Sequence, residues 1–589
     1  MLAPRSNWRF PTPVTVSSAL LDAALDLGLG ARATAVLAAR GVIEEDDLRR
    51  FLGDPAGSLH DPALLPDAEI FRARILAARD RGETVLVFGD FDADGITGLA
   101  ILTLALRRLG VSVVPYVPSR LDEGHGLSLA SVAAATAAGA TVIVTVDTGS
   151  SSVDEVAAAN AAGIDVLITD HHQLPPRLPA AIAIVNPHRP DATYPEQRLA
   201  GSGVAFTLAR LLLGEAALAL ADLAAIGTVA DLAPVLGENR AIVQVGLERI
   251  RTDPRPGIAA LLAAANLTPD RIDLESLAFA IAPRLNAAGR VGEAFDAARL
   301  LLAEDATEAA VLAGTLEAAN GTRRDLMKTA IAEARVSPDA VDDGAATIVH
   351  GPWPVGIVGL VASRLADERR RPAIVGADLG PVIRASCRSG GTGVHLAETL
   401  AACSDLLLRH GGHAGAAGFE IETERWTEFR ERFLELAAAA GPPDPVATLV
   451  LDVALRGRDV DYALHRDLQR LAPCGAGNPE PLVAVLGLTV TRVREAGGGG
   501  HTQLTLKRRL DVIDGIAFGW PELAREVHEG DVIDIVGQLR SRRFGGIESL
   551  QLEIHDVAPT GFHPEARAIL EAMPIAVGPG PAVGLASGG

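Results

Sequence analysis

One stretch decides the fold of this chain: Thr84-Val-Leu-Val-Phe-Gly-Asp-Phe-Asp-Ala-Asp-Gly-Ile-Thr97. Its continuous apolar run before Gly89 is typical of a strand covered on both faces. Asp90, Asp92 and Asp94 then follow within five residues. Carboxylates this close together repel one another and are not buried without compensation. The stretch is therefore either a solvated acidic turn that caps a helix or, at the carboxyl end of a parallel strand, the start of a divalent-cation site.

Strand and helix patterns alternate across residues 84–190. Strands are predicted at Thr84–Gly89, Val111–Val117, Thr141–Val146, Ile164–Thr169 and Ala181–Val185. Helices are predicted at Ile96–Leu109, Leu129–Ala137 and Val153–Ala162. This alternation predicts an α/β fold built on a doubly wound parallel sheet.

Two further strands of this sheet also end in candidate metal ligands. One runs into Asp147, and the next runs into Asp170-His171-His172. Because the carboxyl ends of parallel strands share one edge of a sheet, we expect these side chains to meet Asp92 and Asp94. Carboxylates with one or two imidazoles suit Mn²⁺ or Mg²⁺ better than a structural zinc site. Taken singly, Asp147 as a turn residue and His171 as a hydrogen-bonded core histidine remain open.

A further acid, Asp231, stands in the otherwise apolar stretch Ile226–Leu236, at the end of a predicted helix. A carboxylate in this position either caps the helix or completes the metal site, and the pattern leaves both interpretations open.

Length and composition are those of a globular protein. The 589 residues suggest three or four domains, and 48% hydrophobic with 22% charged residues suffice for cores. There is no run of 18 apolar residues and no signal-peptide core near the start, so we expect a cytoplasmic protein without a membrane segment. Cys387, Cys403 and Cys474 are too scattered for a disulfide framework or a zinc site.

The net charge of −21 argues against nucleic-acid binding, unless cations gather in a local patch. The cations are nearly all arginine, since Lys328 and Lys507 are the only lysines. Arginine suits bidentate contacts to phosphate, although genome composition could produce the same bias.

Four motifs in order resemble those of the DHH phosphoesterase superfamily: Asp90-Phe-Asp92-Ala-Asp94-Gly, Val146-Asp147-Thr-Gly, Asp170-His171-His172 and Gly227-Thr-Val-Ala-Asp231. Later segments are similar to the linker and DHHA1 segments of the RecJ family, the bacterial single-strand-specific 5′→3′ DNA exonucleases. They are Pro283-Arg284-Leu-Asn286-Ala-Ala-Gly-Arg290, Gly356–Arg364, Arg388-Ser389 and Gly411-Gly-His413-Ala-Gly-Ala-Ala-Gly418. Leu471–Pro481 resembles the start of the OB-fold domain of that family. The resemblance covers roughly residues 35 to 558.

The resemblance implies a phosphodiesterase that uses two Mn²⁺ or Mg²⁺ ions. It assigns the metal ligands as Asp92, Asp94, Asp147, His171 and Asp231, with Asp147 bridging. In the same scheme His172 faces the scissile phosphate and completes the catalytic set, whereas Asp90 and Asp170 orient ligands. Two metals would generate a hydroxide and neutralise both the attacking and the leaving oxygens.

The resemblance also implies where the substrate is held. Arg120, Ser386 and Arg388 are candidates for gripping a 5′ phosphate, next to Ser389. Gly411, Gly412 and His413 form a predicted glycine-rich turn whose amides can approach an anion, although a simple tight turn is the alternative. Arg284 and Arg290 lie on the linker and would track the strand, although each could equally form a surface ion pair.

The sequence departs from the family pattern at two positions. Phe88 stands where some relatives carry a histidine four residues before the first ligand, so one metal is expected to have one ligand fewer. Pro354 follows Trp353, where RecJ-like chains often have a histidine, so a phosphate contact is expected to be absent.

The predicted domains are an N-terminal helical segment, a DHH domain, a helical linker, a smaller α/β DHHA1 domain, an OB-fold β-barrel and a flexible tail. Their ranges are residues 1–80, 81–235, 236–335, 336–440, 446–558 and 559–589. Basic clusters at Lys507-Arg508-Arg509 and Arg540–Arg543 lie at predicted barrel turns near aromatic residues, which suits single-stranded nucleic acid. Among those aromatic residues, Phe518 is expected in the core.

The leading hypothesis is a single-stranded-DNA-specific 5′→3′ exonuclease acting in DNA repair and recombination. A DHH phosphoesterase for short oligonucleotides or nucleoside bisphosphates is the alternative, and a catalytically inactive replication scaffold is the non-enzymatic one. The resemblance implies a strand with a 5′ end as partner, together with a helicase and a single-strand-binding protein. We expect a monomer.

Overall fold

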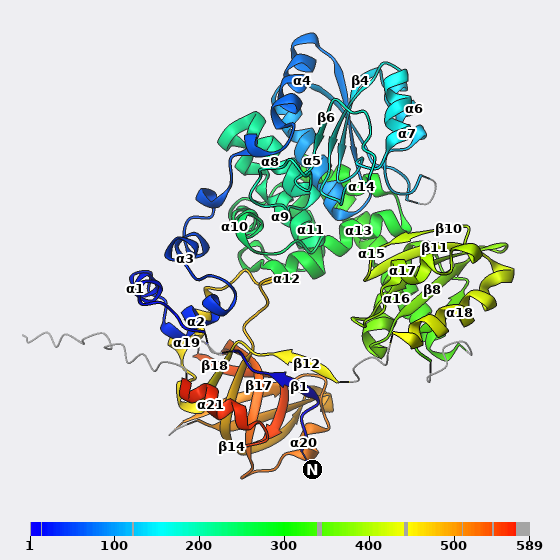
Figure 1. Ribbon diagram of the computed structural model, residues 1–589. Helices are drawn as coiled ribbons and strands as arrows, with labels where there is room; N and C mark the ends of the chain where they lie inside the picture. Colours follow the sequence, from blue (N-terminus) through cyan, green and yellow to red (C-terminus); the bar gives the residue numbers. More distant parts are fainter. Residues whose placement is uncertain are drawn as a thin grey trace, which may run out of the picture. The chain divides into compact units, whose positions relative to one another are not determined.

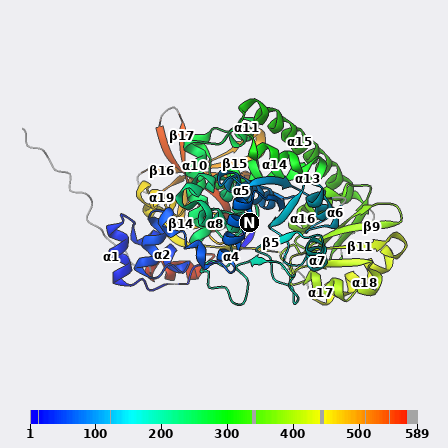
Figure 2. The ribbon, with the colours of Figure 1, turned by 90° about the horizontal axis from the view of Figure 1, so that it is seen from above.

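The computed structural model describes residues 2–12, 14–120, 123–337, 344–440, 446–508, 511–544 and 547–572. They form two compact units. The larger unit contains residues 58–445 and 475–477, and the smaller unit contains the described residues up to 57, 446–474 and those from 478 onward. Figure 1 labels the helices and strands, and Figure 2 shows the same ribbon from above.

A five-stranded parallel sheet lies at the centre of the first lobe of the larger unit, in the order β3-β2-β4-β5-β6. The strands are β2 (Thr84–Gly89), β3 (Ser112–Tyr116), β4 (Ala140–Val146), β5 (Asp165–Thr169) and β6 (Ala183–Val185). The predicted parallel sheet is confirmed, and each strand lies within two residues of its predicted bounds.

Helices cover both faces of this sheet (Figure 1). Along β2, Val85 and Val87 belong to the core that also contains residues of α4 (Ala68–Arg81) and α5 (Ala93–Arg108). Leu86 and Phe88 point the other way, into the core shared with α6 (Leu129–Ala137) and α7 (Val153–Ala161). Alternation of side chains along a strand that is apolar throughout is what a sheet buried on both faces requires.

The helix after the acidic run starts earlier than predicted, at Ala93 and not at Ile96. The reason is the Asp92 side chain, which is the N-cap and accepts hydrogen bonds from the amides of Asp94 and Gly95. Asp94 therefore lies in the first turn of α5.

A helical region follows the sheet, and its part from residue 237 onward lies where the helical linker was predicted. Its helices are α8 (Gly201–Leu213), α9 (Ala221–Ala230), α10 (Gly237–Thr252), α11 (Pro256–Ala264), α12 (Leu274–Ser276), α13 (Ala282–Val291), α14 (Ala294–Leu302) and α15 (Ala306–Val336). Among the described residues, the stretch Gly201–Ala230 could cross a membrane by length and composition alone. Its helices α8 and α9 contribute many residues to the core of the lobe, which explains their apolar composition.

The second lobe of the larger unit is the predicted small α/β domain. Its sheet has the order β10-β11-β9-β8-β7, and α16, α17 and α18 accompany it. The elements are β7 (Thr347–Gly351), α16 (Val355–Arg369), β8 (Ala373–Asp378), β9 (Val382–Arg388), α17 (Leu396–Ala401), β10 (Arg409–Gly412), β11 (Ala416–Glu422) and α18 (Trp426–Ala439). The predicted glycine-rich turn is confirmed at residues 413–415, whereas Gly411 and Gly412 pair with β11 as the end of the edge strand β10.

The smaller unit contains the predicted barrel. Five strands close on themselves in the order β14-β15-β16-β18-β17, with β17 pairing back to β14. They are β14 (Val483–Ala496), β15 (His501–Lys507), β16 (Val512–Ala517), β17 (Val532–Phe544) and β18 (Ile547–Pro559). Phe518 was expected in the core but is 59% exposed, whereas Trp520, two residues later, is buried at 4%.

Residues from the start of the chain belong to this barrel unit. Strand β1 (Ser6–Arg9) pairs with β12 (Ala447–Val450), and the Trp8 indole donates to Asp556 at 2.8 Å. Helices α1 (Ser18–Asp26), α2 (Ala31–Ala39) and α3 (Glu45–Leu52) complete the N-terminal part. The remaining elements are β13 (Val453–Arg456), α19 (Tyr462–Gln469), α20 (Leu523–Glu526) and α21 (Pro564–Ala572). Of the predicted tail, residues 573–589 lie outside the described residues, as does Arg509 of the basic cluster.

Candidate active site

Three aspartates lie side by side at the carboxyl edge of the parallel sheet. Asp90, Asp147 and Asp170 directly follow β2, β4 and β5. Their backbone amides extend the hydrogen bonding of the sheet beyond the strand ends. Asp90 donates to the carbonyl of Val146, Asp147 to that of Thr169 and Asp170 to that of Val185. The backbone pairing therefore sets the spacing of these acids before any side chain interacts.

Asp94 is held by the start of another helix. Its carboxylate accepts hydrogen bonds from the amides of Gly201 and Ser202 at 2.6 and 3.0 Å. These are the first residues of α8, where unpaired amides and the helix dipole favour an anion. Asp94 is buried at 2% exposure, so this contact compensates part of its charge.

Glycines allow the acids to pack directly against helix backbone. A Cβ on Gly201 would lie 2.6 Å from the Cβ of Asp147, and one on Gly227 would lie 2.5 Å from the Oδ1 of Asp94. Both approaches are closer than real Cβ atoms make. The glycines of the motif around Asp231 and of the start of α8 are thus required by packing.

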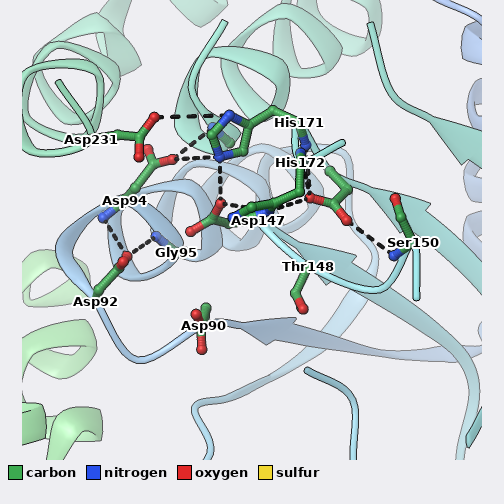
Figure 3. Close-up of polar contacts among 12 residues, drawn as sticks. Asp90, Asp92, Asp94, Gly95, Asp147, Thr148, Ser150, His171, His172 and Asp231 are labelled. Atoms are coloured by element: carbon green, nitrogen blue, oxygen red, sulfur yellow. Dashed lines mark hydrogen bonds and ion pairs between the residues drawn. The ribbon is translucent and has the colours of Figure 1, made fainter. Parts of the chain in front are cut away.

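His171 is the centre of the cluster (Figure 3). Its Nε2 lies 3.0 Å from Asp147 Oδ1 and 3.9 Å from Asp94 Oδ2, and its Nδ1 lies 3.8 Å from Asp231 Oδ2. Asp231 is the C-cap residue of α9, which confirms its predicted place at a helix end. The structure therefore brings together Asp94, Asp147, His171 and Asp231 as predicted from separate strands and a helix end.

Two buried atoms of this cluster lack a hydrogen-bond partner, Asp147 Oδ1 and His171 Nε2. They are only 3.0 Å apart. Buried polar atoms are almost always paired, so unpaired atoms aimed at a common space fit ligands of a cation. Three groups of candidate ligand atoms lie within 4.8 Å of one another: Asp94-His171-Asp231, Asp90-Asp92-Asp147 and Asp147-His171-His172. The donor set fits one or two hard divalent cations.

Electrostatics in the cluster also favour the binding of a cation. Burial, with the charges of Asp90 and Asp94, raises the pKa of Asp92 to about 6. Burial and the charges of Asp94 and Asp92 raise the pKa of Asp231 to about 8, and burial raises that of Asp147 well above its usual range. Burial lowers the pKa of His171, which favours the neutral imidazole that can ligate a metal.

Asp147 stands in a conformation that side chains rarely adopt, with φ of +62°. Strained residues of this kind persist only where the surroundings over-determine them, and they concentrate at functional sites. Here the amide of Asp147 is bonded to Thr169, and its side chain is pressed between Gly201 and His171.

Asp170 orients and charges His172. Its Oδ1 accepts from His172 Nδ1 at 2.8 Å, and its Oδ2 accepts from the amide of Ser150 at 3.0 Å. The bond to Asp170 raises the pKa of His172 to about 9, whereas the same contacts hold the pKa of Asp170 well below its usual range against the effect of burial. His172 is therefore protonated at neutral pH, and 57% of its side chain is exposed.

Two residues near the acids were not predicted. His125 Nδ1 lies 3.0 Å from Asp90 Oδ2, and Asn286 Oδ1 accepts from the amide of Ala93. Neither residue directly follows a strand, so a search for polar side chains at strand ends could not find them. Asn286 lies in the motif Pro283–Arg290, which carried the family resemblance, but no role was assigned to it. Phe88, where a histidine was expected in relatives, is fully buried and stacks on Tyr116.

Three predicted arginines gather beside the acids. Burial, with Arg120 and Arg323 nearby, lowers the pKa of Arg290 to about 10. Burial also lowers the pKa of Arg120, which interacts with Asp90, Asp92 and Arg388. A Cβ on Gly359 would lie 3.3 Å from Arg388 Nη2 and 3.4 Å from Ser386 Oγ, so these two side chains share one spot over α16.

The other predicted substrate residues lie elsewhere. Arg284 is buried, and its Nε pairs with Glu317 at 2.6 Å, so its charge is already compensated. Ser389 donates its amide to Gly415, and the amide of His413 donates to Ala416. Gly411, Gly412 and His413 are exposed on β10 and the turn after it.

Two family models match the chain. The DHH family, N-terminal domain, matches residues 84–228, and the RecJ OB domain matches residues 451–556. These ranges contain the parallel sheet with its acidic edge and the closed barrel.

Curated relatives match most of the chain. The single-stranded-DNA-specific exonuclease RecJ of Bacillus subtilis is 34% identical over 563 residues, which cover 95% of this chain and 71% of that protein. The Escherichia coli protein of the same name is 37% identical, covering 81% of this chain and 88% of its own. The crystal structure of RecJ from Thermus thermophilus in complex with Mn²⁺ superposes with a TM-score of 0.80 at 31% identity, covering 95% of this chain and 81% of that chain. On the order of its motifs, the geometry of its acidic edge and these matches, the chain belongs to the RecJ family.

Proposed function

We propose that this protein is a divalent-metal-dependent exonuclease that hydrolyses single-stranded DNA from its 5′ end, in DNA repair and recombination. The observation that carries the proposal is the meeting of Asp94, Asp147, His171 and Asp231 around two unpaired buried atoms. The relatives reported above are named single-stranded-DNA-specific exonucleases, and the solved relative holds Mn²⁺.

The residues that would hold two metals are Asp92, Asp94, Asp147, His171 and Asp231. Asp147 belongs to two of the three ligand groups, which supports a bridging role. Asp90 and Asp170 would orient their neighbours, Asp90 with His125 and Asp170 with His172. Bound divalent cations neutralise the phosphodiester charge and lower the pKa of the attacking water.

His172 supplies a cationic donor next to this centre. Its Nδ1 is hydrogen-bonded to Asp170. In the protonated imidazole the other ring nitrogen, Nε2, also carries a proton and can donate it to a different acceptor. A charged donor at hydrogen-bond distance from a non-bridging phosphate oxygen would stabilise the negative charge that builds up during hydrolysis.

The arginines account for the direction of degradation. Arg120, Arg290 and Arg388 interact electrostatically with one another, and the acids that act on them are Asp90 and Asp92 for Arg120 and Asp92 for Arg290. A terminal 5′ phosphate has the charge and geometry that guanidinium groups bind. Bound there, it would place the next phosphodiester beside the acids, so cleavage would proceed from that end.

The barrel offers a surface for the rest of the strand besides the predicted basic clusters, of which two cations are paired with acids. Arg508 is held by Asp511, and Arg540 by Glu480 and Glu553, so these cations of the predicted clusters are compensated. Arg492 and Arg494 lie on one face of β14, and by register His501 lies on the same face of β15. The exposed Phe518 packs edge-on against His501 at 5.3 Å. Cations beside an exposed aromatic ring suit single-strand binding.

Single-stranded DNA is thus the proposed partner. A helicase, a single-strand-binding protein, a monomeric state and a cytoplasmic location belong to the same proposal and rest on the family resemblance.

Replacing Asp147 by alanine is expected to abolish cleavage while leaving DNA binding nearly unchanged. Loss of a metal ligand removes several kcal/mol of transition-state stabilisation, which is roughly a thousandfold or more in kcat. The measurements are Mn²⁺-dependent degradation of a 5′-labelled strand and its Kd by anisotropy. Asp154→Ala, an exposed acid on α7, is the control. An equal loss of binding and activity would contradict the assigned role.

The metal-free protein is expected to lose stability as pH rises from about 5 to 8. Asp92 and Asp231 have folded-state pKa values of about 6 and about 8, above their values in the unfolded chain. In that window the folded state retains protons that the unfolded state has released, so stability falls with pH. Mn²⁺ should therefore raise the Tm more at pH 8 than at pH 5, as measured by calorimetry. Asp231→Asn should flatten the metal-free trend and Asp154→Asn should not; equal Mn²⁺ shifts at both pH values would argue against a metal at these acids.

Arg388→Gln is expected to reduce the preference for a 5′-phosphorylated over a 5′-hydroxyl strand. Hydrogen bonds to charged groups contribute about 1.5–3 kcal/mol, so kcat/KM on the phosphorylated strand should fall about tenfold to a hundredfold. Activity on the hydroxyl strand should change little. Arg364→Gln removes a guanidinium on the same lobe that is paired with Glu368 and is the control. The 5′-phosphate assignment fails if both strands lose activity equally.

Phe518→Ala combined with Arg492→Gln is expected to weaken binding of long strands and to leave cleavage of short ones intact. Base stacking contributes about 1–3 kcal/mol, so the Kd for a long strand should rise by at least about tenfold. The lost charge should also lower the salt dependence of binding. Arg508→Gln changes the same charge at a compensated position and serves as the control. Unchanged affinity in the double variant would place the strand elsewhere.

A further inference from the structure

Leu232, the residue after Asp231, combines two features that the fold does not explain. Its backbone is left-handed, with φ of +59°, and its side chain is 74% exposed. Residues with a Cβ rarely adopt this conformation, because Cβ crowds the following carbonyl, and leucine adopts it more rarely than asparagine or aspartate.

The turn that holds Leu232 is a Schellman motif at the end of α9. The Leu232 amide donates to the Val229 carbonyl at 3.3 Å, and the Ala233 amide donates to the Thr228 carbonyl at 3.1 Å. The residue in Leu232's position of this motif is usually glycine and sometimes asparagine.

Six other helix ends in the described part of the chain follow that rule. The same pair of amide-to-carbonyl bonds closes each of these six ends. The left-handed residues there are Gly28, Gly41, Gly82, Gly110, Gly163 and Asn266. Leu232 departs from this rule, as does Arg370, the left-handed residue at the end of α16.

Packing does not compensate for the unfavourable backbone. A leucine side chain that is 74% exposed buries little apolar surface, so glycine or asparagine would suit the fold better. A backbone outlier without a structural gain points to a role in function.

The position of Leu232 suggests that role. The Asp231 carboxylate is 3.8 Å from His171 Nδ1, so the next residue stands beside the metal-binding cluster. Arginines gather near Asp90 and Asp92 and suit the phosphates. An aliphatic group adds nothing to phosphate binding, whereas unstacked bases of a single strand expose apolar faces.

We propose that Leu232 makes an apolar contact with a base that flanks the scissile phosphate and is a specificity-determining residue for single-stranded DNA. The inference rests on the proposed nuclease function. In a duplex the faces of the bases are stacked on one another, so this contact is available only to an unpaired strand.

The test compares Leu232→Asn with the unaltered protein on two 5′-phosphorylated oligodeoxynucleotides in Mn²⁺. One carries normal bases, and the other carries abasic tetrahydrofuran residues on both sides of the first scissile phosphate. On the normal strand the variant should lose about fivefold or more in kcat/KM, as expected for one lost apolar contact. On the abasic strand the two proteins should agree within about twofold.

Asparagine is tolerated in the left-handed position, so Leu232→Asn should keep or raise the Tm. Leu232→Gly should behave in the same way and guards against an effect specific to asparagine. Val311→Asn removes another exposed aliphatic side chain, on α15, and should leave both activities unchanged. Equal activity of variant and unaltered protein on the normal strand, or the same loss on both strands, overturns the inference. If the unaltered protein cuts neither strand, the proposed nuclease function itself fails.

Discussion

Repulsion among carboxylates at one edge of a parallel sheet is the constraint on which this structure depends. Asp90, Asp147 and Asp170 are set side by side by backbone pairing, and Asp94 is added from the helix that follows the first of them. Asp170 has a cationic partner in His172. Burial, together with the charges of the neighbouring acids, raises the pKa of Asp92, Asp147 and Asp231. A fold that keeps such an arrangement needs divalent cations to stabilise it.

The helical region after the sheet supplies several of the contacts that hold these acids in place. The first amides of α8 hold Asp94, the end of α9 delivers Asp231, and α13 contributes Asn286 to the acidic loop. Close approach needs glycine at both helix contacts, as Gly201 and Gly227 show. The motif around Asp231 is therefore as much a packing motif as a ligand motif.

Local pattern was enough to predict the sheet, the barrel and most of the acidic edge, because strand ends in a parallel sheet must converge. Local pattern was not enough where the start of a helix depends on a capping side chain, or where the place of a residue depends on contacts with distant parts of the chain. The start of α5 was missed because the Asp92 side chain caps it. The place of the first residues was missed because Trp8 meets Asp556, far along the chain. Phe518 was misjudged because exposure depends on barrel register, and the choice between the two interpretations of Arg284 stayed open because its partner Glu317 lies on another helix.

Two residues of the site, Asp147 and Leu232, share an unfavourable left-handed backbone. For Asp147 the surroundings explain it, since a bonded amide and packed neighbours hold the side chain against His171. For Leu232 no such packing exists, although six other helix ends that close with the same pair of bonds use glycine or asparagine. Selection for stability alone would remove that leucine, since most proteins tolerate strain only where activity gains from it. The metal-binding edge is therefore bounded by two strained residues, one that positions a ligand and one whose exposed side chain has a use only when a strand is bound.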